Sequence, residues 1–290
     1  MADDIYKIGF DDFPPLLKEI NDPPKELYIR GNLPNPADYT YLAVVGSRYH
    51  SSYGKEVCES LIESLRGLPV VIVSGLALGI DSIAHTSALK SDLKTIAIPG
   101  SGLDPKNIYP RTHQKLAQKI VESGGALVSE FSPDTQAAPW TFPRRNRIMA
   151  GLSAATLVIE AREKSGTLIT TRLAMEYNRD VLVVPGSIFN AGSIGPLKLL
   201  KDGATPILNG ADLKEALGFK TDEKDVTEKI DIDSLSGPEQ EIFKLLAKNN
   251  MPRTEIFIHL KLATEDINTA LTMLELRGLI TETAGEMRLI

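Results

Sequence analysis

The stretch VVIVSGLALGIDSIAHTSALK, residues 70–90, decides the fold. Four apolar β-branched residues and a serine come first, a glycine-containing turn follows, and a helical segment completes the unit. A strand that is apolar at consecutive positions is buried on both faces. The stretch therefore predicts one strand–turn–helix unit of a parallel sheet that helices cover on both sides.

Further runs of the same kind lie on either side of this unit. They are Tyr41–Val45, Thr95–Ile98, Ala126–Ser129, Thr156–Glu160 and Val181–Val184. Each run is followed by a turn with Gly or Ser and then by a helical stretch. This alternation predicts a doubly wound α/β fold with a mostly parallel sheet.

The chain divides into four predicted segments. Residues 1–40 are rich in Pro, Asp and Asn, and we expect an extension of short helical and strand pieces packed on the α/β domain of residues 41–219. Residues 220–234 hold three lysines and six acidic residues among few apolar ones, which predicts a linker. Residues 235–290 show three helical segments and a terminal hairpin, the outline of a winged helix.

Composition places the chain among ordinary globular proteins, with 290 residues, 42% of them hydrophobic and 24% charged. The single cysteine, Cys58, excludes an intrachain disulfide, and the four histidines show no zinc-type spacing, so we expect no metal. The N-terminus lacks a signal-peptide pattern and no segment approaches the roughly 20 apolar residues of a membrane span. We therefore expect a cytoplasmic protein with no membrane partner.

The net charge of −6 does not indicate general nucleic-acid binding. Most of this acidity lies after residue 219, however, so a local basic site in the larger domain stays possible. Acid–base pairs are scarce, because no acidic residue has a histidine or serine at the spacing of a catalytic pair. We interpret Asp81 as a helix-terminus acid and His85 as a residue packed on its helix, and we expect no catalytic residue.

The turns after the strands are candidate phosphate sites. Gly and Ser there leave backbone N–H groups free at helix N-termini, where the helix dipole favours an anion. The turns concerned are Gly46-Ser47-Arg48, Ser74-Gly75 through Gly79, and Ser165-Gly166-Thr167. A tight turn needs glycine whether or not it binds a ligand, but the recurrence of Ser beside Gly along one rim favours phosphate. No G-x-x-x-x-G-K-[ST] or G-x-G-x-x-G motif is present at these turns, so we expect no nucleotide cofactor.

The string FPRRNR carries the most specific local pattern. It places Phe142 close to Arg144 and Arg145 in the sequence. Proteins that bind single strands typically stack an aromatic ring on a base and place cations beside the phosphates. A solvated basic turn is the alternative. We interpret Trp140, the only tryptophan, as a core residue, and Arg147 equally as a structural ion-pair former.

In their order along the chain, these turns resemble the DprA/Smf family of DNA-processing proteins. The matching strings are AVVGSR, SGLALGIDSIAH, IPGSGLDPKNIYP, SEFSPDTQAAPWTFPRRNRIMAGLS, VIEAREKSGTLITTRLA and VVPGSIFNAGSIGPLKLLKDGA, within residues 10–218. A winged-helix tail also occurs in that family. The resemblance implies an extended Rossmann-like domain that binds single-stranded DNA without catalysis and forms a homodimer. It also implies that the protein protects incoming DNA in natural transformation and loads the RecA recombinase.

The resemblance also implies roles for individual residues. Arg48 would grip a phosphate, Phe142 would stack on a base, and the glycine turns would line the pocket. The predicted DNA-binding residues are Gly46, Ser47, Arg48, Ser74, Gly75, Gly79, Phe142, Arg144, Arg145, Asn146, Ser165, Gly166 and Thr167. We expect the dimer interface at Ile194, Leu197 and Leu200, with coverage of the sheet by these residues as the alternative.

Two other functions remain open. A phosphoribohydrolase would use a Gly-Thr turn followed by a helix with a carboxylate, here Glu176, although the paired glycines before Gly-Thr in such enzymes are missing. A winged-helix repressor would need duplex binding by residues 235–290. The predicted recognition helix, Thr264–Gly278, has more acids than its single arginine, which disfavours a duplex and favours a protein-interaction or structural role.

Overall fold

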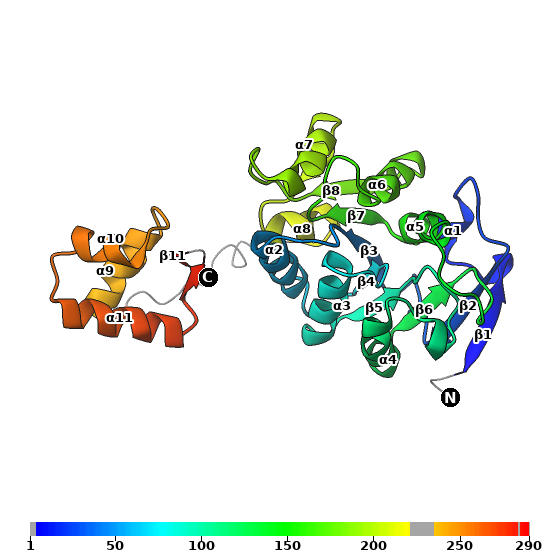
Figure 1. The fold of residues 1–290 in the computed structure, drawn as a ribbon, viewed down its shortest axis with the longest axis horizontal. Helices are drawn as coiled ribbons and strands as arrows, with labels where there is room; N and C mark the ends of the chain where they lie inside the picture. Colours follow the sequence, from blue (N-terminus) through cyan, green and yellow to red (C-terminus); the bar gives the residue numbers. More distant parts are fainter. Residues whose placement is uncertain (1–3, 221–234, 284, 290) are drawn as a thin grey trace. The chain divides into compact units, whose positions relative to one another are not determined.

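The computed structural model of the chain describes residues 4–220, 235–283 and 285–289. These residues form two compact units, one within residues 1–221 and one within residues 222–290 (Figure 1). The predicted linker, residues 220–234, lies outside the described residues apart from its first position.

The larger unit is built on one sheet, whose order within residues 4–220 is β1-β2-β6-β5-β4-β3-β7-β8-β9. The parallel strands are β3 (Thr40–Val45), β4 (Val70–Ser74), β5 (Lys94–Ala97), β6 (Ala126–Ser129), β7 (Ala155–Val158), β8 (Asp180–Val183) and β9 (Thr205–Pro206). The predicted mostly parallel sheet is confirmed. Strand order reverses at β3, which pairs with β4 on one side and β7 on the other, and such a reversal opens a crevice at the carboxyl ends of the strands.

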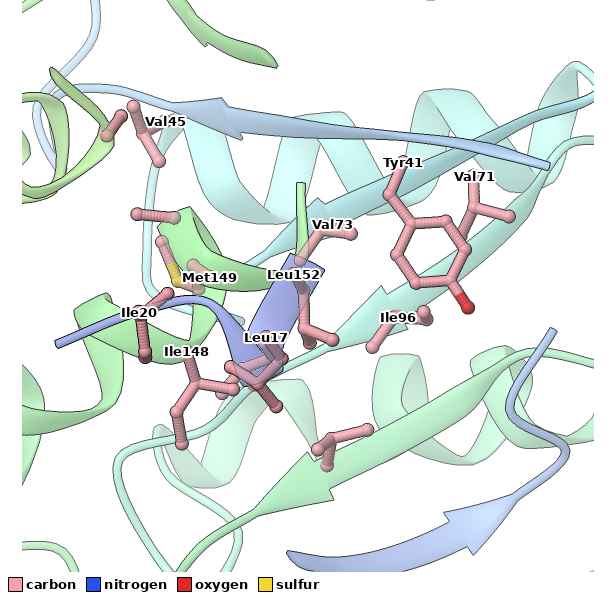
Figure 2. Packing of buried hydrophobic residues seen from close by; sticks show 14 of the residues in the cluster. Leu17, Ile20, Tyr41, Val45, Val71, Val73, Ile96, Ile148, Met149 and Leu152 are labelled. Carbon is pink, nitrogen blue, oxygen red and sulfur yellow. The ribbon is translucent and has the colours of Figure 1, made fainter. Parts of the chain in front are cut away.

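The N-terminal segment extends this sheet by a hairpin. Strands β1 (Ile5–Gly9) and β2 (Glu26–Gly31) are antiparallel, and β2 pairs antiparallel with β6. Between them lie a 3-10 turn, Phe10–Asp12, and the short helix α1 (Pro15–Lys18). Leu17 of α1 is fully buried and packs in the cluster that holds Ile148 and Leu152 (Figure 2).

Helices cover both faces of the sheet, as the apolar strands predict (Figure 1). One face carries α5 (Thr141–Leu152), α6 (Thr167–Glu176) and α7 (Ile194–Lys201) together with α1, and the other carries α2 (Ser52–Glu63), α3 (Ile80–Lys90), α4 (Gln114–Glu122) and α8 (Gly210–Ala216). Alternate residues of β3 enter the two cores: Tyr41 and Val45 face one cluster (Figure 2), and Leu42 and Val44 face the other. Three short 3-10 turns, Pro105–Asn107, Arg111–His113 and Ala191–Ser193, complete the connections.

The smaller unit is the predicted winged helix. It comprises α9 (Gly237–Leu246), α10 (Arg253–His259), α11 (Thr264–Leu276), β10 (Ile280–Thr283) and β11 (Glu286–Leu289). A capping box of Ser236 and Glu239 stabilises the start of α9. The unit has its own core, in which Ile242, Leu271 and Met287 are fully buried. In neither unit is any described helix both long and apolar enough to cross a membrane.

His85 of α3 is buried between the helix and the sheet. Its Nδ1 lies 2.7 Å from Oγ1 of Thr95, which itself donates to the carbonyl of Ile72 at 2.7 Å. Burial, with the cation of Arg145 adding to it, lowers the pKa of His85 to about 3. The ring is therefore neutral at physiological pH and serves the packing, as the sequence predicts.

We expect the free energy of unfolding of the α/β unit to fall between pH 6.5 and 4. In that window the unfolded chain takes up a proton on His85 that the buried ring does not accept, which corresponds to at most about 1.4 kcal/mol per pH unit. Urea unfolding followed by the emission of Trp140, the only tryptophan, measures the slope. The His85→Gln variant should show a shallower slope, and equal slopes would contradict this account.

Candidate nucleic-acid interface

A cavity of about 610 Å³ opens at the point where the strand order reverses. Three segments form most of it: the loop after β3, the loop after β7 with the start of α6, and the first half of α5. The turn after β4 and the start of α3 add Ala77 and Asp81. Its lining residues are Val45, Gly46, Ser47, Arg48, Tyr49, Ala77, Asp81, Pro139, Phe142, Pro143, Arg145, Asn146, Met149, Arg162, Lys164, Ser165, Gly166, Thr167, Ile169 and Thr170. The cavity thus lies where an open α/β sheet binds its ligands.

The loop after β3 carries Arg48 to the mouth of this cavity. The amide of Ile80 donates to the carbonyl of Ser47 at 3.1 Å, which ties the loop to the start of α3. Gly79, at φ +80°, is required here, because a Cβ at this position would lie 2.3 Å from the Ser47 oxygen. Arg48 is exposed, and its guanidinium carbon lies 5.5 Å from the ring centre of Phe142.

The carboxylate of Glu160 holds the start of α2, which follows this loop. Glu160 is buried at the end of β7 and accepts from the amide of Ser51 at 2.9 Å and from its hydroxyl at 2.5 Å. The same hydroxyl accepts from the amide of Gly54 at 3.0 Å and caps the helix. Both oxygens of Glu160 are therefore engaged in holding the helix terminus.

The loop after β7 is tied to the loop after β3. The hydroxyl of Thr167 donates to the carbonyl of Gly46 at 3.1 Å, and the amide of Thr167 donates to the hydroxyl of Ser165 at 3.2 Å. The side-chain amide of Asn146, on α5, reaches the carbonyl of Gly166 at 3.5 Å. The three segments around the cavity are thus joined by direct hydrogen bonds.

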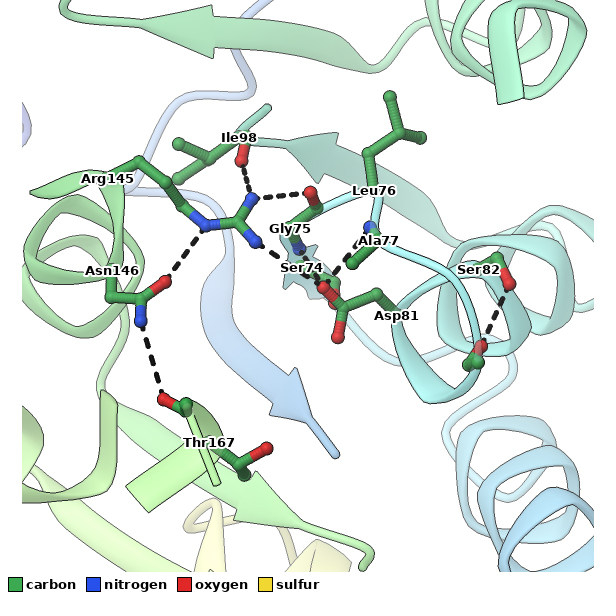
Figure 3. Close-up of polar contacts among 12 residues, drawn as sticks. Ser74, Gly75, Leu76, Ala77, Asp81, Ser82, Ile98, Arg145, Asn146 and Thr167 are labelled. Atoms are coloured by element: carbon green, nitrogen blue, oxygen red, sulfur yellow. Dashed lines mark hydrogen bonds and ion pairs between the residues drawn. The ribbon is translucent and has the colours of Figure 1, made fainter. Parts of the chain in front are cut away.

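Arg145 forms the floor of the cavity (Figure 3). Its guanidinium donates to the carbonyls of Gly75 and Ile98, and its Nε donates to the side chain of Asn146 at 2.9 Å. It passes so close over Gly75 that a Cβ there would lie 2.1 Å from Nη2. The carboxylate of Asp81 lies 3.8 Å from the guanidinium.

Asp81 is the partner charge of this arginine. Its Oδ2 accepts from the amides of Gly75 and Ala77 at 3.2 and 3.3 Å. Burial raises the pKa of Asp81, while Arg145 and the two amides oppose that rise. Burial likewise lowers the pKa of Arg145, to about 10, so the guanidinium stays charged at neutral pH. Asp81 lies in the first turn of α3, the helix-terminus position that the sequence predicts, and its carboxylate holds the turn before the helix.

The accessible charge of the cavity is positive. Arg48, Arg162 and Lys164 line it and are exposed. The only acidic residue in the lining is Asp81, which is buried and already bonded. Phe142 provides an aromatic surface beside these cations. The cavity can therefore hold a phosphate next to a flat apolar ring.

Nine of the thirteen residues predicted to bind DNA line this cavity, so the turns do converge. The other four are Ser74, Gly75, Gly79 and Arg144. Ser74 is buried and donates to the carbonyl of Val44 at 2.7 Å, and the two glycines shape the loops. Arg145 was predicted to contact the DNA beside Phe142. In the structure it is buried and its N–H groups donate to other parts of the protein, so it supports the cavity from below.

Two cations of the cavity were missed by the sequence argument. Arg162 and Lys164 belong to the same turn as Ser165, within the string VIEAREKSGT. Their position in the sequence could have identified them, because they lie between the end of β7 and the glycine turn that faces the cavity. Glu163 lies between them in sequence, but it pairs with Lys198 at 2.6 Å.

Three further interpretations can be checked. Trp140 as a core residue is wrong, because 58% of it is exposed. Arg147 as a structural ion-pair former is confirmed, with Glu130 at 2.5 Å. Glu176, the acid that a phosphoribohydrolase would need, is exposed at the last residue of α6, whereas the first residue of that helix lines the cavity. No group of three potential metal-ligating side chains occurs among the described residues.

Removal of Arg145 should destabilise the larger unit strongly. We expect Arg145→Ala to lower the free energy of unfolding at pH 7 by about 3–5 kcal/mol, because Asp81 would be left as an unpaired buried charge. Urea unfolding measures this loss. Without the arginine the pKa of Asp81 rises further, so the deficit should shrink as the pH falls through that pKa.

The variant with both Arg145→Ala and Asp81→Asn separates the charge from the packing. It should be more stable than Arg145→Ala alone, because no uncompensated carboxylate remains. If both variants lose the same stability at every pH, the pairing of the two charges does not support the cavity floor.

Comparisons with known proteins agree with this geometry. The profile of the family "DNA recombination-mediator protein A" matches residues 5–218, and that of the "DprA winged helix domain" matches residues 228–286. Protein Smf of Escherichia coli is 45% identical over 71% of this chain, which spans 54% of that protein. The DNA processing protein DprA of Streptococcus pneumoniae is 42% identical over 74% of each chain.

Solved structures show the same fold. DprA from Streptococcus pneumoniae superposes with a TM-score of 0.68 at 37% identity, over 76% of each chain. DNA processing protein A from Helicobacter pylori, described with its single-stranded DNA binding mode, gives 0.67 at 31% identity over 74% of this chain and 96% of that one. The chain therefore belongs to the DNA recombination-mediator protein A family, which includes the DprA and Smf proteins.

Proposed function

We propose that this chain binds single-stranded DNA in the cavity at the strand-order reversal. The observation that carries the proposal is that three exposed cations, Arg48, Arg162 and Lys164, line the same cavity as the ring of Phe142, with the guanidinium carbon of Arg48 5.5 Å from the ring centre. Cations that follow phosphates and an aromatic face that accepts a base are what binding without sequence preference requires. The single-stranded DNA binding described for the Helicobacter pylori relative supports the same ligand.

The dimensions of the cavity favour a single strand over a duplex. Its volume of about 610 Å³ is that of a site for a small ligand. A base can reach the ring of Phe142 only when it is free of its pairing partner. The cavity therefore suits a few unpaired nucleotides, with the remainder of the strand continuing over the surface.

The proposed biological role follows the family. The relatives are DNA processing proteins, and we propose that this chain protects incoming single strands in natural transformation and loads the RecA recombinase onto them. The chain spans only part of the length of its relatives, 54% for the Escherichia coli protein. The proposed loading of RecA therefore needs a test on this chain itself. The test measures whether the chain allows RecA filaments to grow on single-stranded DNA that is already covered by a competing single-strand-binding protein.

Binding, and not catalysis, is proposed because the acids are poorly placed for proton transfer. Asp81 is held by two amides and a guanidinium, and Glu176 is at the far end of α6. Incubation with nucleoside monophosphates should release no free base. Release that is abolished in Glu176→Gln would instead favour the phosphoribohydrolase function.

For the winged helix we propose a protein-interaction role. The surface of α11 exposes Glu265, Asp266 and Glu275. A duplex backbone would be repelled by these carboxylates, since duplex affinity depends on neutralising phosphate charge. A repressor function is therefore disfavoured, and the separate unit of residues 235–290 should show no specific duplex binding.

We also propose a homodimer that uses α7 and the loop before it. Leu199 is buried and Leu200 packs against the core, so that part of the predicted interface covers the sheet, as in the alternative interpretation. Ile194 and Leu197 are only half-buried. The loop before α7 adds Phe189, which is 92% exposed, and exposed apolar surface of this kind is typical of an interface.

Arg48→Ala should weaken binding to a dT oligomer roughly 10- to 100-fold at low salt, because a charge-assisted phosphate contact is lost. The dependence of log K on log salt should become shallower by about 0.7 for this single phosphate contact. Fluorescence anisotropy of a labelled oligomer measures both. Arg66→Ala is the matched control, because Arg66 is an exposed cation beyond the opposite end of α2. Equal affinity of the two variants would remove Arg48 from the site.

Phe189→Asp and Leu197→Asp should each shift a dimer toward monomer, because a carboxylate would be buried in the interface. Light scattering after size-exclusion chromatography measures the mass. Tyr6→Asp is the control. Tyr6 is a partly exposed aromatic residue on β1, and β1 is at the other end of the sheet from β9, the strand that follows α7. A monomeric unmodified chain, or a dimer that survives both interface variants, would contradict the proposed interface.

A further inference from the structure

Trp140 is an exposed aromatic residue that the DNA-binding cavity leaves unexplained. It directly precedes α5, is 58% exposed, and does not line the cavity. Tryptophan is rarely exposed to this extent and is enriched at binding surfaces, where its large apolar ring contacts a partner. The residue therefore needs an account other than core packing.

The indole is held in a defined position. Its ring meets that of Phe131 edge-on, with the centroids 5.5 Å apart and the planes at 88°. Phe131 is itself buried, and its amide donates to the hydroxyl of Ser129 at 3.1 Å. The next residue, Thr141, anchors the start of α5 by donating to the carbonyl of Gly100 at 2.5 Å. One edge of the indole thus rests on a fixed aromatic support.

A cation lies beside the indole. Arg144 is 54% exposed, and its guanidinium carbon lies 6.0 Å from the ring centre of Phe131, the same ring that supports Trp140. Its Nε donates to Glu130 at 2.9 Å. Glu130 is only 4% exposed and also binds Arg147 at 2.5 Å, and Arg147 in turn lies 3.5 Å from the exposed carboxylate of Asp22. The buried Glu130 is therefore shared by two arginines, and the guanidinium of Arg144 faces solvent. The surface at Trp140 is therefore aromatic and cationic.

Along the chain, this surface directly adjoins residues that line the cavity. Pro139 and Phe142, on either side of Trp140 and Thr141 in the sequence, both line it. A strand that leaves the cavity past Phe142 can therefore cross the start of α5 and meet the indole. The phosphate of the next nucleotide would then have Arg144 within reach.

We infer that Trp140 is a second base-stacking platform, which binds a nucleotide of the strand outside the cavity, with Arg144 as its phosphate contact. The inference rests on the proposed function, because it extends the path of the same single strand. A polynucleotide is the occupant that the chemistry favours, since it alone supplies a flat base and an anion at adjacent positions of one chain. The platform lengthens the binding footprint beyond what the cavity can hold.

The test uses the fact that the full chain has one tryptophan. Its emission is recorded during titration with dT oligomers of 2 to 20 nucleotides, while anisotropy of a labelled oligomer reports binding independently. We expect the emission to be quenched by oligomers long enough to leave the cavity and to remain unchanged with dinucleotides. An oligomer of equal length with abasic positions should bind through its phosphates without the same quenching.

Variants supply the second measurement. Trp140→Ala should weaken binding of the 20-mer roughly 5- to 100-fold, leave dinucleotide binding unchanged, and shorten the minimum length for full affinity. Trp140→Phe should retain most of the affinity. Leu208→Ala, at a 73% exposed residue of similar apolar character after β9, is the matched control and should change nothing.

Two results would overturn the inference, and they are distinguishable. If anisotropy shows binding while the emission of Trp140 stays constant and Trp140→Ala binds normally, the strand does not pass over the indole and the cavity alone is the site. If the unmodified chain binds no oligomer of any length by either signal, the proposed function fails and this inference fails with it.

Discussion

The cavity depends on one buried guanidinium. Arg145 connects the turn after β4 to the end of β5 through the carbonyls of Gly75 and Ile98, and it faces Asp81 at the start of α3. A buried cation is tolerable only where carbonyls and a carboxylate replace the water it has lost. The turns that it joins are therefore held in one arrangement, and they form the floor of the cavity whose rim carries the exposed cations.

This arrangement separates support from recognition. The acids close to the cavity, Asp81 and Glu160, are committed to backbone amides or to a serine, so neither is available to transfer a proton. The exposed groups are cations and an aromatic ring, which under the proposed function would attract a strand and stack a base. Such a surface would bind and release DNA with an affinity that depends on salt.

The sequence predicted strands β3 to β8 to within two residues at each end, because these strands are buried on both faces and lie between glycine turns. It assigned no bounds to β1, β2 and β9. It also predicted convergence of the turns, because the carboxyl ends of parallel strands meet at one edge. It did not distinguish the turns that face the cavity from those that only shape it, such as Ser74, whose hydroxyl is bonded to β3. That distinction depends on which donors are already used, and only packing decides this.

The helix α5 shows most clearly what the sequence alone does not predict. Arg144 and Arg145 are adjacent in a string that predicts a basic patch, yet one is exposed and the other is buried. Successive residues of a helix point about 100° apart. Arg144 can therefore face solvent while its neighbour Arg145 points into the floor of the cavity. The same rotation brings Phe142 to the cavity and leaves Trp140 outside it. If the strand passes across the N-terminus of α5 as inferred, a single turn of this helix would serve two nucleotide positions.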